Sequence, residues 1–310
     1  MAYQMAESIK QSQLELFERN FIRTLNQTDS KLINTPAIQN MGIQGISNLS
    51  TIKDTELTEI TDKGSNPDKV YEDMKTENRR SVQRRFTKTY LVDNYDKTVN
   101  LICDPTSDLF LNLKEAKVRM VDKCAADAAI APVFIGAPNE VATSKTDEQD
   151  GVMKIDATTL GAFDYENVIS PAITMFENNY VNCETGVTLA VSAVEAQGLR
   201  NDDKYMNAFY SNQNTVDKGK ISNASGFNVV TFAGTQNGVS DIALPVLNEN
   251  EGTRTNLILA PKAIAFAYEI GCLKVAPSAT KVNSFEITID LWIKAVRRQG
   301  KKIIKVLTTI

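Results

Sequence analysis

Residues 104 to 132 read DPTSDLFLNLKEAKVRMVDKCAADAAIAP, and this stretch decides the fold class of the chain. Its apolar residues recur at three- and four-residue steps, which is the period of an amphipathic α-helix. Asp104, Thr106 and Ser107 are typical helix-start residues, and Pro132 ends the pattern because proline does not continue a helix. The stretch therefore predicts a long helix over residues 107–131.

One apolar stripe of this predicted helix should pack against the rest of the protein. Its members are Leu109, Leu113, Ala116, Met120, Cys124 and Ala128, with Val121 and Ala125 beside them. We predict that Leu113, Met120 and Cys124 form the core of the helix and face a sheet made by the C-terminal residues. Trp292, the single tryptophan, lies in that predicted sheet and is expected in the core.

The residues before the long helix change character twice. Residues 8–25 have the pattern of an amphipathic helix, whereas residues 26–78 are polar, rich in turns and too poor in apolar residues to bury themselves. From residue 82 the sequence VQRRFTKTYLVDNYDKTVNLI (82–102) has period two, which predicts an extended β-hairpin with its turn near residues 93–96. We expect an arm followed by a protruding hairpin.

After the long helix, shorter helices and strands alternate. A polar connection over residues 138–162 should end in a short strand near residues 151–155. The later predicted elements are a helix over 164–178 containing Pro171, a buried strand over 187–191, a short helix over 192–199, apolar strand-like segments at 227–234 and 256–268, and a final strand pair, 285–298 and 300–310, with Gly300 in the turn. This mixture predicts an α+β chain.

Composition excludes several classes of catalytic site. The 310 residues include no histidine, which removes Ser-His-Asp triads, Cys-His pairs and His-bearing zinc sites, although carboxylate, lysine and tyrosine chemistry stay open. The four cysteines lack CxxC spacing, and no phosphate-binding glycine loop occurs. Acidic clusters at 93–96, 147–150 and 201–204 lack calcium-loop spacing and indicate turns. We predict a protein that is not an enzyme, without catalytic residues, cofactor or metal.

Positive charge is concentrated in two stretches, although the net charge is −4. Residues 79–88, RRSVQRRFTK, and residues 294–305, KAVRRQGKKIIK, contain basic residues and no acidic one. The cations of the first stretch are Arg79, Arg80, Arg84, Arg85 and Lys88. Such stretches contact nucleic acid or an acidic patch on a neighbouring subunit, or they form a solvated strand face.

Taken in order, these elements resemble the major capsid proteins of tailed bacteriophages with the Hong Kong 97-like fold. The resemblance starts with Gln27, Ser30, Lys31 and Leu32 after the early helix, and continues with RRFTKTYLVDNYDKTVNLICDPTS (84–107). It also includes an Arg-x-x-Asp pair, Arg119 and Asp122, then KGKISNASGFNVV (218–230), APKAIAFA (260–267) and the closing strands. Each motif is weak alone, and their order covers nearly the whole chain.

The resemblance implies an α+β Hong Kong 97-like capsid fold with four parts. These are an N-terminal arm (1–40), an extended E-loop hairpin (41–104), a peripheral domain (105–179 and 259–310) that includes a spine helix (107–131), and an axial domain (180–258). The implied function is self-assembly into pentamers and hexamers that form the icosahedral shell around the double-stranded DNA genome of a phage. Alternatives are an encapsulin-type protein compartment and a free-standing nucleic-acid-binding protein.

The resemblance also implies partners and contacts. Besides other copies of itself, the chain is expected to meet a portal protein, a separate scaffolding protein, a possible decoration protein and, without sequence specificity, the packaged DNA. No membrane contact is expected, and the implied location is the virion capsid, assembled in the cytoplasm of the bacterial host. The cations Arg79, Arg80, Arg84, Arg85 and Lys88 are expected to bind acidic surface on an adjacent subunit. Covalent cross-links through Lys63, Lys69 or Lys75 are not expected.

Overall fold

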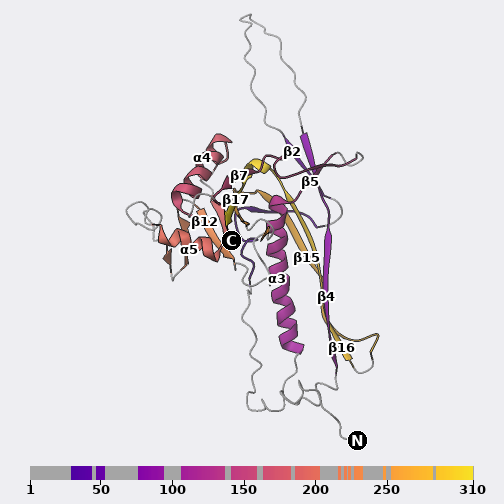
Figure 1. The fold of residues 1–310 in the computed structure, drawn as a ribbon. Helices are drawn as coiled ribbons and strands as arrows, with labels where there is room; N and C mark the ends of the chain where they lie inside the picture. The colour runs from indigo at the N-terminus through magenta and orange to yellow at the C-terminus, as the bar shows by residue number, and fades with distance from the viewer. Residues whose placement is uncertain are drawn as a thin grey trace, which may run out of the picture.

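The computed structural model mixes helices and strands, as the sequence predicts for an α+β chain (Figure 1). The residues that it describes are 29–43, 47–52, 76–93, 106–136, 141–158, 163–182, 186–202, 216–217, 220–221, 223–224, 227–232, 247–248, 253–281 and 284–309. Predictions that lie outside these residues include the helix over 8–25, the hairpin turn beyond residue 93 with the second hairpin strand over 97–102, and the absence of cross-links at Lys63, Lys69 and Lys75.

The predicted long helix is confirmed as α3, Thr106–Ile130. It packs on a four-stranded sheet with the order β1-β15-β16-β4, in which the short β1 is parallel to β15 and the other pairs are antiparallel. The strand bounds are β1 Ile38–Asn40, β4 Arg84–Asp93, β15 Ile264–Pro277 and β16 Ser284–Arg297. Alternate residues of β16, Ile287 and Ile289, pack on Leu113 of α3.

The partner of β4 differs from the one that the sequence predicts. β4 pairs over its whole length with β16, from Arg84 opposite Ile293 to Asp93 opposite Ser284. A period-two pattern identifies a strand but carries no information about a partner some 200 residues away. The predicted 82–102 hairpin therefore missed the principal partner of its first strand.

The second small sheet contains a different strand pair from the predicted one. β2 (Ser47–Ile52) and β3 (Thr76–Ser81) form an antiparallel ladder. β5 (Val133–Ile135) and β6 (Thr143–Lys145) extend it to the order β2-β3-β5-β6. Figure 1 shows this small sheet at one end of the molecule, beside the C-terminal end of α3. It connects directly to α3, because β5 follows the helix in the chain.

The third sheet has seven strands in the order β11-β12-β8-β14-β17-β7, with β13 paired to β14. The strands are β7 Met153–Asp156, β8 Val187–Ser192, β11 Asn223–Ala224, β12 Phe227–Phe232, β13 Leu247–Asn248, β14 Thr253–Leu259 and β17 Ile303–Thr309. β9 (Val216–Asp217) and β10 (Lys220–Ile221) form a separate pair. The predicted strands near 151–155, 187–191 and 227–234 are confirmed here.

Short helices cover this sheet. A π-helical turn, η1 (Tyr165–Ile169), leads into α4 (Ser170–Asn178), where Pro171 occupies the first turn and breaks no hydrogen bond of the helix. α5 (Ala193–Asn201) begins at Ser192, whose side chain accepts a hydrogen bond from the backbone of Val194. The predicted helices over 164–178 and 192–199 are thus confirmed.

The predicted final strand pair is wrong, because β16 and β17 belong to different sheets. The 3₁₀ turn η2, Gly300–Lys302, separates them and leads the chain into the seven-stranded sheet. Gly300 packs against the backbone of Asp150 so closely that a Cβ would lie 2.0 Å from the Asp150 carbonyl oxygen. The glycine is needed for this close approach, whereas the sequence suggested only a turn residue.

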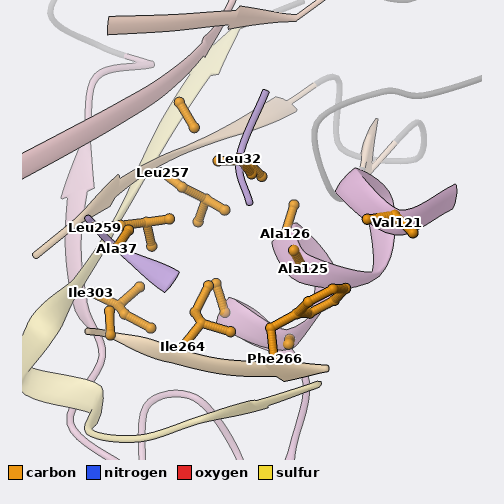
Figure 2. Close-up of a cluster of buried hydrophobic side chains, with 14 of the residues drawn as sticks. Leu32, Ala37, Val121, Ala125, Ala126, Leu257, Leu259, Ile264, Phe266 and Ile303 are labelled. Carbon is orange, nitrogen blue, oxygen red and sulfur yellow. The ribbon is translucent and has the colours of Figure 1, made fainter. Parts of the chain in front are cut away.

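Residues 29–43, called the strap below, contribute two side chains to the core, although the sequence predicts that residues 26–78 are too poor in apolar residues to bury themselves. Leu32 and Ala37 of the strap are fully buried. Figure 2 shows them among side chains of α3, β14, β15 and β17. Two apolar residues suffice because neighbouring elements supply the rest of the core.

The buried stripe of α3 is centred one residue from the predicted one. Val121, Ala125 and Ala129 are almost completely buried, whereas Met120 and Cys124 are partly buried at the edge of the same cluster. Leu113 is buried, as predicted, in a smaller cluster with β16. The alanines allow the strap to approach the helix closely, which a stripe of large residues would prevent.

Trp292 is half-buried and lies on the face of β16 opposite to Ile287, Ile289 and Leu291. It therefore does not face α3, although α3 packs on the sheet that contains Trp292, as predicted. Its alternation with apolar residues was read correctly as a strand, but adjacent residues of a strand point to opposite faces.

Candidate functional site

Asp122 of α3 holds the start of the strap. Its carboxylate accepts hydrogen bonds from Ser30 Oγ at 2.5 Å, Lys31 N at 3.0 Å and Leu32 N at 3.2 Å. Asp122 is 1% exposed, so these donors replace the water that a buried carboxylate loses. The Asp122 of the Arg-x-x-Asp pair therefore fixes the point at which the N-terminal residues meet the long helix.

The strap also connects the two larger sheets. Lys31 Nζ donates to the Thr231 carbonyl at 2.7 Å and lies 5.5 Å from the centre of the Phe232 ring, both on β12. Farther along, β1 adds to the edge of β15. The strap thus contacts α3, the seven-stranded sheet and the four-stranded sheet, and it limits their relative movement.

A buried ion cluster lies at the base of the β2–β3 hairpin. Asp150 accepts hydrogen bonds from both terminal nitrogens of Arg79, at 2.6 and 2.8 Å, and from Arg297 Nε at 2.7 Å. The side chains of Asp150 and Arg297 are 2% and 0% exposed. Bidentate geometry and burial make these charge-assisted bonds strong and directional. They join β3, the end of β16 and the 147–150 turn.

Two further groups complete this cluster. Glu77 binds Arg79 at 2.9 Å and Lys145 at 3.4 Å, which adds a second carboxylate opposite the arginines. Arg297 Nη1 donates to the carbonyls of Ala129 at 2.8 Å and Ala131 at 3.2 Å, at the C-terminal end of α3. A cation at that end also interacts favourably with the helix dipole. The cluster therefore fixes the hairpin base to the long helix.

The structure separates the five cations that were predicted to contact a neighbouring subunit. Arg79 is 5% exposed and internal, so its prediction as an inter-subunit contact is wrong. Arg85 binds Asp290 of the same chain at 2.5 Å, and this hydrogen bond lowers the pKa of the Asp290 carboxyl. Arg80 is half-buried, whereas Arg84 and Lys88 are exposed. Arg84, Arg85 and Lys88 thus retain the exposure that such a contact requires, and Arg85 is already paired with Asp290.

The second basic stretch, residues 294–305, is only partly exposed. Lys294 and Arg297 are fully buried, and Lys305 binds Asp147 at 2.6 Å. Asp147 and Asp150 both lie in the acidic 147–150 cluster, which forms a turn as predicted. The pairing of these turn residues with cations could not be predicted from the sequence, because their partners are more than 70 residues away.

A second buried polar network links α5 to the seven-stranded sheet. Arg254 donates to Glu195 at 3.0 Å and to Ser192 at 3.1 Å, and Thr308 donates to the same Glu195 oxygen at 2.7 Å. None of these residues was singled out from the sequence. Arg254 of β14 and Glu195 of α5 form an ion pair across the contact between the sheet and the helix, which indicates a structural role.

The described residues offer little for catalysis or ligand chemistry. Burial raises the pKa of the Cys124 thiol to about 11, so this thiol is protonated and unreactive at neutral pH. Within the described ranges, no group of three or more acidic or cysteine side chains is placed to hold a metal ion. In the same part of the chain, no helix has the length and apolar character needed to cross a membrane.

Several solved phage structures, capsids among them, have the same fold. The asymmetric unit of the mature bacteriophage PhiM1 capsid matches with a TM-score of 0.64 at 12% identity, covering 94% of this chain and 90% of that one. The capsid of cyanophage P-SCSP1u matches with 0.62 at 10%, covering 95% and 94%. Mycobacterium phage Che8 matches with 0.60 at 14%, covering 93% and 97%. These likenesses establish a capsid-type fold.

The phage capsid protein family model matches residues 9–310, so the chain belongs to that family. Comparison with curated protein sequences gives no match. Together with the fold, the family match identifies the chain as a major capsid protein that forms the shell, and it does not favour the encapsulin-type compartment. The buried clusters described above are therefore structural features of a shell subunit.

Proposed function

We propose that the chain assembles into pentamers and hexamers that close into an icosahedral shell around the double-stranded DNA of a phage. The observation that carries the proposal is the family match over residues 9–310. The described geometry supports it, because a rigid body with a projecting β-ladder suits contacts that reach beyond one subunit. No catalytic step is proposed for any residue.

Assembly of this kind rests on many weak contacts. Head-to-tail contacts between copies of one chain form closed rings where the rotation between copies closes, and filaments where it does not. Contacts worth only a few kcal/mol each become effective when several form together, because later contacts are intramolecular. Weak single contacts also let a wrongly placed subunit leave. The internal ion cluster and the strap support this mechanism by keeping the subunit rigid.

We retain the four-part division of the capsid fold with two changes. The arm is proposed to end near residue 29, because the strap is part of the core. The E-loop is proposed to span about residues 47–81 rather than 41–104, because β4 pairs with β16 in the sheet under α3. The proposed spine helix is α3, and the proposed axial and peripheral domains keep their expected ranges of 180–258 and 105–179 with 259–310.

The remaining partners are proposed from the family alone. They are a portal protein, a separate scaffolding protein, a possible decoration protein and the packaged DNA, with assembly in the bacterial cytoplasm and residence in the virion capsid. Arg84 and Lys88 are proposed as contacts to acidic surface on a neighbouring subunit, because they are exposed and lie together on β4.

Sedimentation velocity over a concentration series tests the proposal. A shell protein should give free subunits or capsomers below a threshold concentration and large particles of uniform size above it, with little between. A monomer at every concentration would contradict shell assembly. Open polymers of continuously increasing size would contradict closure.

A further inference from the structure

A hollow of about 90 Å³ lies at the corner where β3, β4 and β16 meet the C-terminal end of α3. β3 ends at Ser81 and β4 begins at Arg84, so the chain passes here from one sheet to another. At the same corner α3 ends at Ile130 and β5 begins at Val133 (Figure 1). The hollow has room for about three water molecules, which suits a small ion and is too little for a nucleotide or another large ligand.

Positive charge exceeds negative charge around this hollow. Three cations and one acid line it: Arg80 of β3, Arg84 of β4, Arg297 of β16 and Asp127 of α3. Asp150, which binds Arg297, is shared with Arg79 of the ion cluster, so one carboxylate serves two guanidinium groups there. A recess with such a surplus of arginines attracts anions.

Arg297 presents a fixed donor at the buried end of the hollow. Its side chain is 0% exposed, and its Nε donates to Asp150 while its Nη1 donates to the carbonyls of Ala129 and Ala131, which holds the guanidinium group in one orientation. The third nitrogen, Nη2, is buried and donates to no acceptor among the described residues. A buried donor without an acceptor is unfavourable, and a charged oxyanion is a stronger acceptor for a guanidinium group than a neutral one. Arg297 therefore indicates an anionic ligand in this hollow.

Arg84 brings a second charge to the hollow from the solvent side. The side chain is exposed, and within the described part of the chain it forms no ion pair. Burial raises the pKa of Asp127, and the charges of Lys123 and Arg84 oppose this rise, so the charge of Arg84 acts inside the hollow. A guanidinium group has five N–H donors, so Arg84 can bind an anion here and also contact the acidic surface of a neighbouring subunit.

We propose that this hollow binds one small oxyanion of the phosphate or sulfate class, held by Arg80, Arg84 and the Nη2 of Arg297. A tetrahedral oxyanion has acceptor oxygens in several directions, so it can bind donors from three strands at once. Bound there, it joins β3, β4 and β16 and limits movement of the hairpin base relative to α3. The inference concerns a single subunit and does not depend on shell assembly.

Melting of the full-length chain in increasing sodium phosphate tests the binding. The protein is kept below the assembly threshold, and sodium chloride holds the ionic strength constant. With a Kd of about 1 mM, about 20 mM phosphate should raise the melting temperature by about 3 °C, and the rise should follow a single-site binding curve. A melting temperature that is the same in phosphate and in chloride alone would overturn the proposal.

Two substitutions of opposite expected effect test the site. Arg84→Gln removes one of the three cations and should weaken phosphate binding about fivefold or more, whereas Asp127→Asn removes the acid and should strengthen it about threefold. Arg200→Gln, at an exposed arginine of α5 outside the hollow, is the matched control and should bind phosphate within about twofold of the unmodified protein. A general stabilising effect of phosphate on the protein surface would be equal in all three variants and would overturn the site.

Hydrogen exchange of the unmodified protein locates the anion without any substitution. Phosphate should slow amide exchange in residues 79–84 and 131–134 relative to chloride and leave α5, residues 193–201, unchanged. Equal slowing in α5, or slowing confined to other parts of the chain, would contradict the site even if a variant failed to fold.

Phosphate groups also occur on nucleic acid, so a short DNA duplex is the second arm of the exchange experiment. A hollow with room for only a small ion should not admit the backbone of a duplex, so the duplex should leave the protection by phosphate in residues 79–84 unchanged. A duplex that displaces phosphate and protects the same residues by itself would assign the hollow to nucleic acid and overturn the proposal of a free oxyanion.

Discussion

Asp150 and Arg297 form an ion pair of 2.7 Å across 147 residues of sequence, and both side chains are almost completely buried. Arg79 occupies the other side of the same carboxylate. Two cations share one buried anion, with Glu77 and the carbonyls at the end of α3 as the remaining acceptors. Removing one member leaves a buried charge without its partner, which is unfavourable.

Asp150→Asn should therefore destabilise the subunit strongly. The change leaves Arg79 and Arg297 buried opposite a neutral amide, and breaking a buried pair in this way costs about 3–5 kcal/mol. Chemical unfolding of the unassembled subunit measures the loss. Asp156→Asn, an exposed aspartate on β7, is the matched control and should change the unfolding free energy by less than about 0.5 kcal/mol. Similar losses in both variants would show that the cluster contributes little.

Charge reversal at Arg79 should prevent folding, whereas charge reversal at Arg84 and Lys88 of β4 should prevent assembly. Arg79→Glu places a second acid beside Asp150 and should give insoluble or unfolded protein. Arg84→Glu with Lys88→Glu should give a folded subunit with a normal circular dichroism spectrum that assembles poorly. Normal particles from the Arg84 and Lys88 double variant would remove these residues from the proposed contact surface.

The register of α3 predicts an order of severity for charged substitutions. Val121→Asp should abolish soluble expression, because position 121 is 2% exposed in the main cluster and an unpaired ion there costs several kcal/mol. Met120→Asp should be milder, since Met120 is partly exposed, and Met120→Leu should behave like the unmodified protein. Soluble yield and melting temperature measure the order. A Met120→Asp protein less stable than Val121→Asp would restore the stripe predicted from the sequence.

The Asp290–Arg85 pair predicts a pH dependence of stability. The hydrogen bond from Arg85 lowers the pKa of Asp290 in the folded state, so the folded protein binds a proton there less readily than the unfolded chain. The pair's contribution is present above the ordinary aspartate range and is lost as pH falls through the lowered folded pKa, below about pH 4. Melting curves of Arg85→Gln and unmodified protein should differ at neutral pH and converge in acid. A difference that persists unchanged in acid would refute the assignment.

Local sequence patterns predicted the helices and strands well, but they did not predict which distant segments contact each other. The helical period and start signals found α3 within one residue at each end, and local pattern also found α5, because these features depend on neighbouring residues. The partner of β4, the separation of β16 from β17 and the burial of the strap depend on contacts between distant residues. The buried ion cluster likewise depends on contacts between residues far apart in the sequence. Arg79 looked like one of five equal surface cations, and only the placement of Asp150 beside it shows that it is internal.

Electron microscopy of the purified protein, at concentrations above the sedimentation threshold, shows whether the chain forms a closed shell. Shell assembly predicts closed particles of uniform diameter whose averaged images show five-fold and six-fold clusters of one 34.2 kDa chain. Soluble monomers, irregular aggregates or open filaments at every concentration would contradict it.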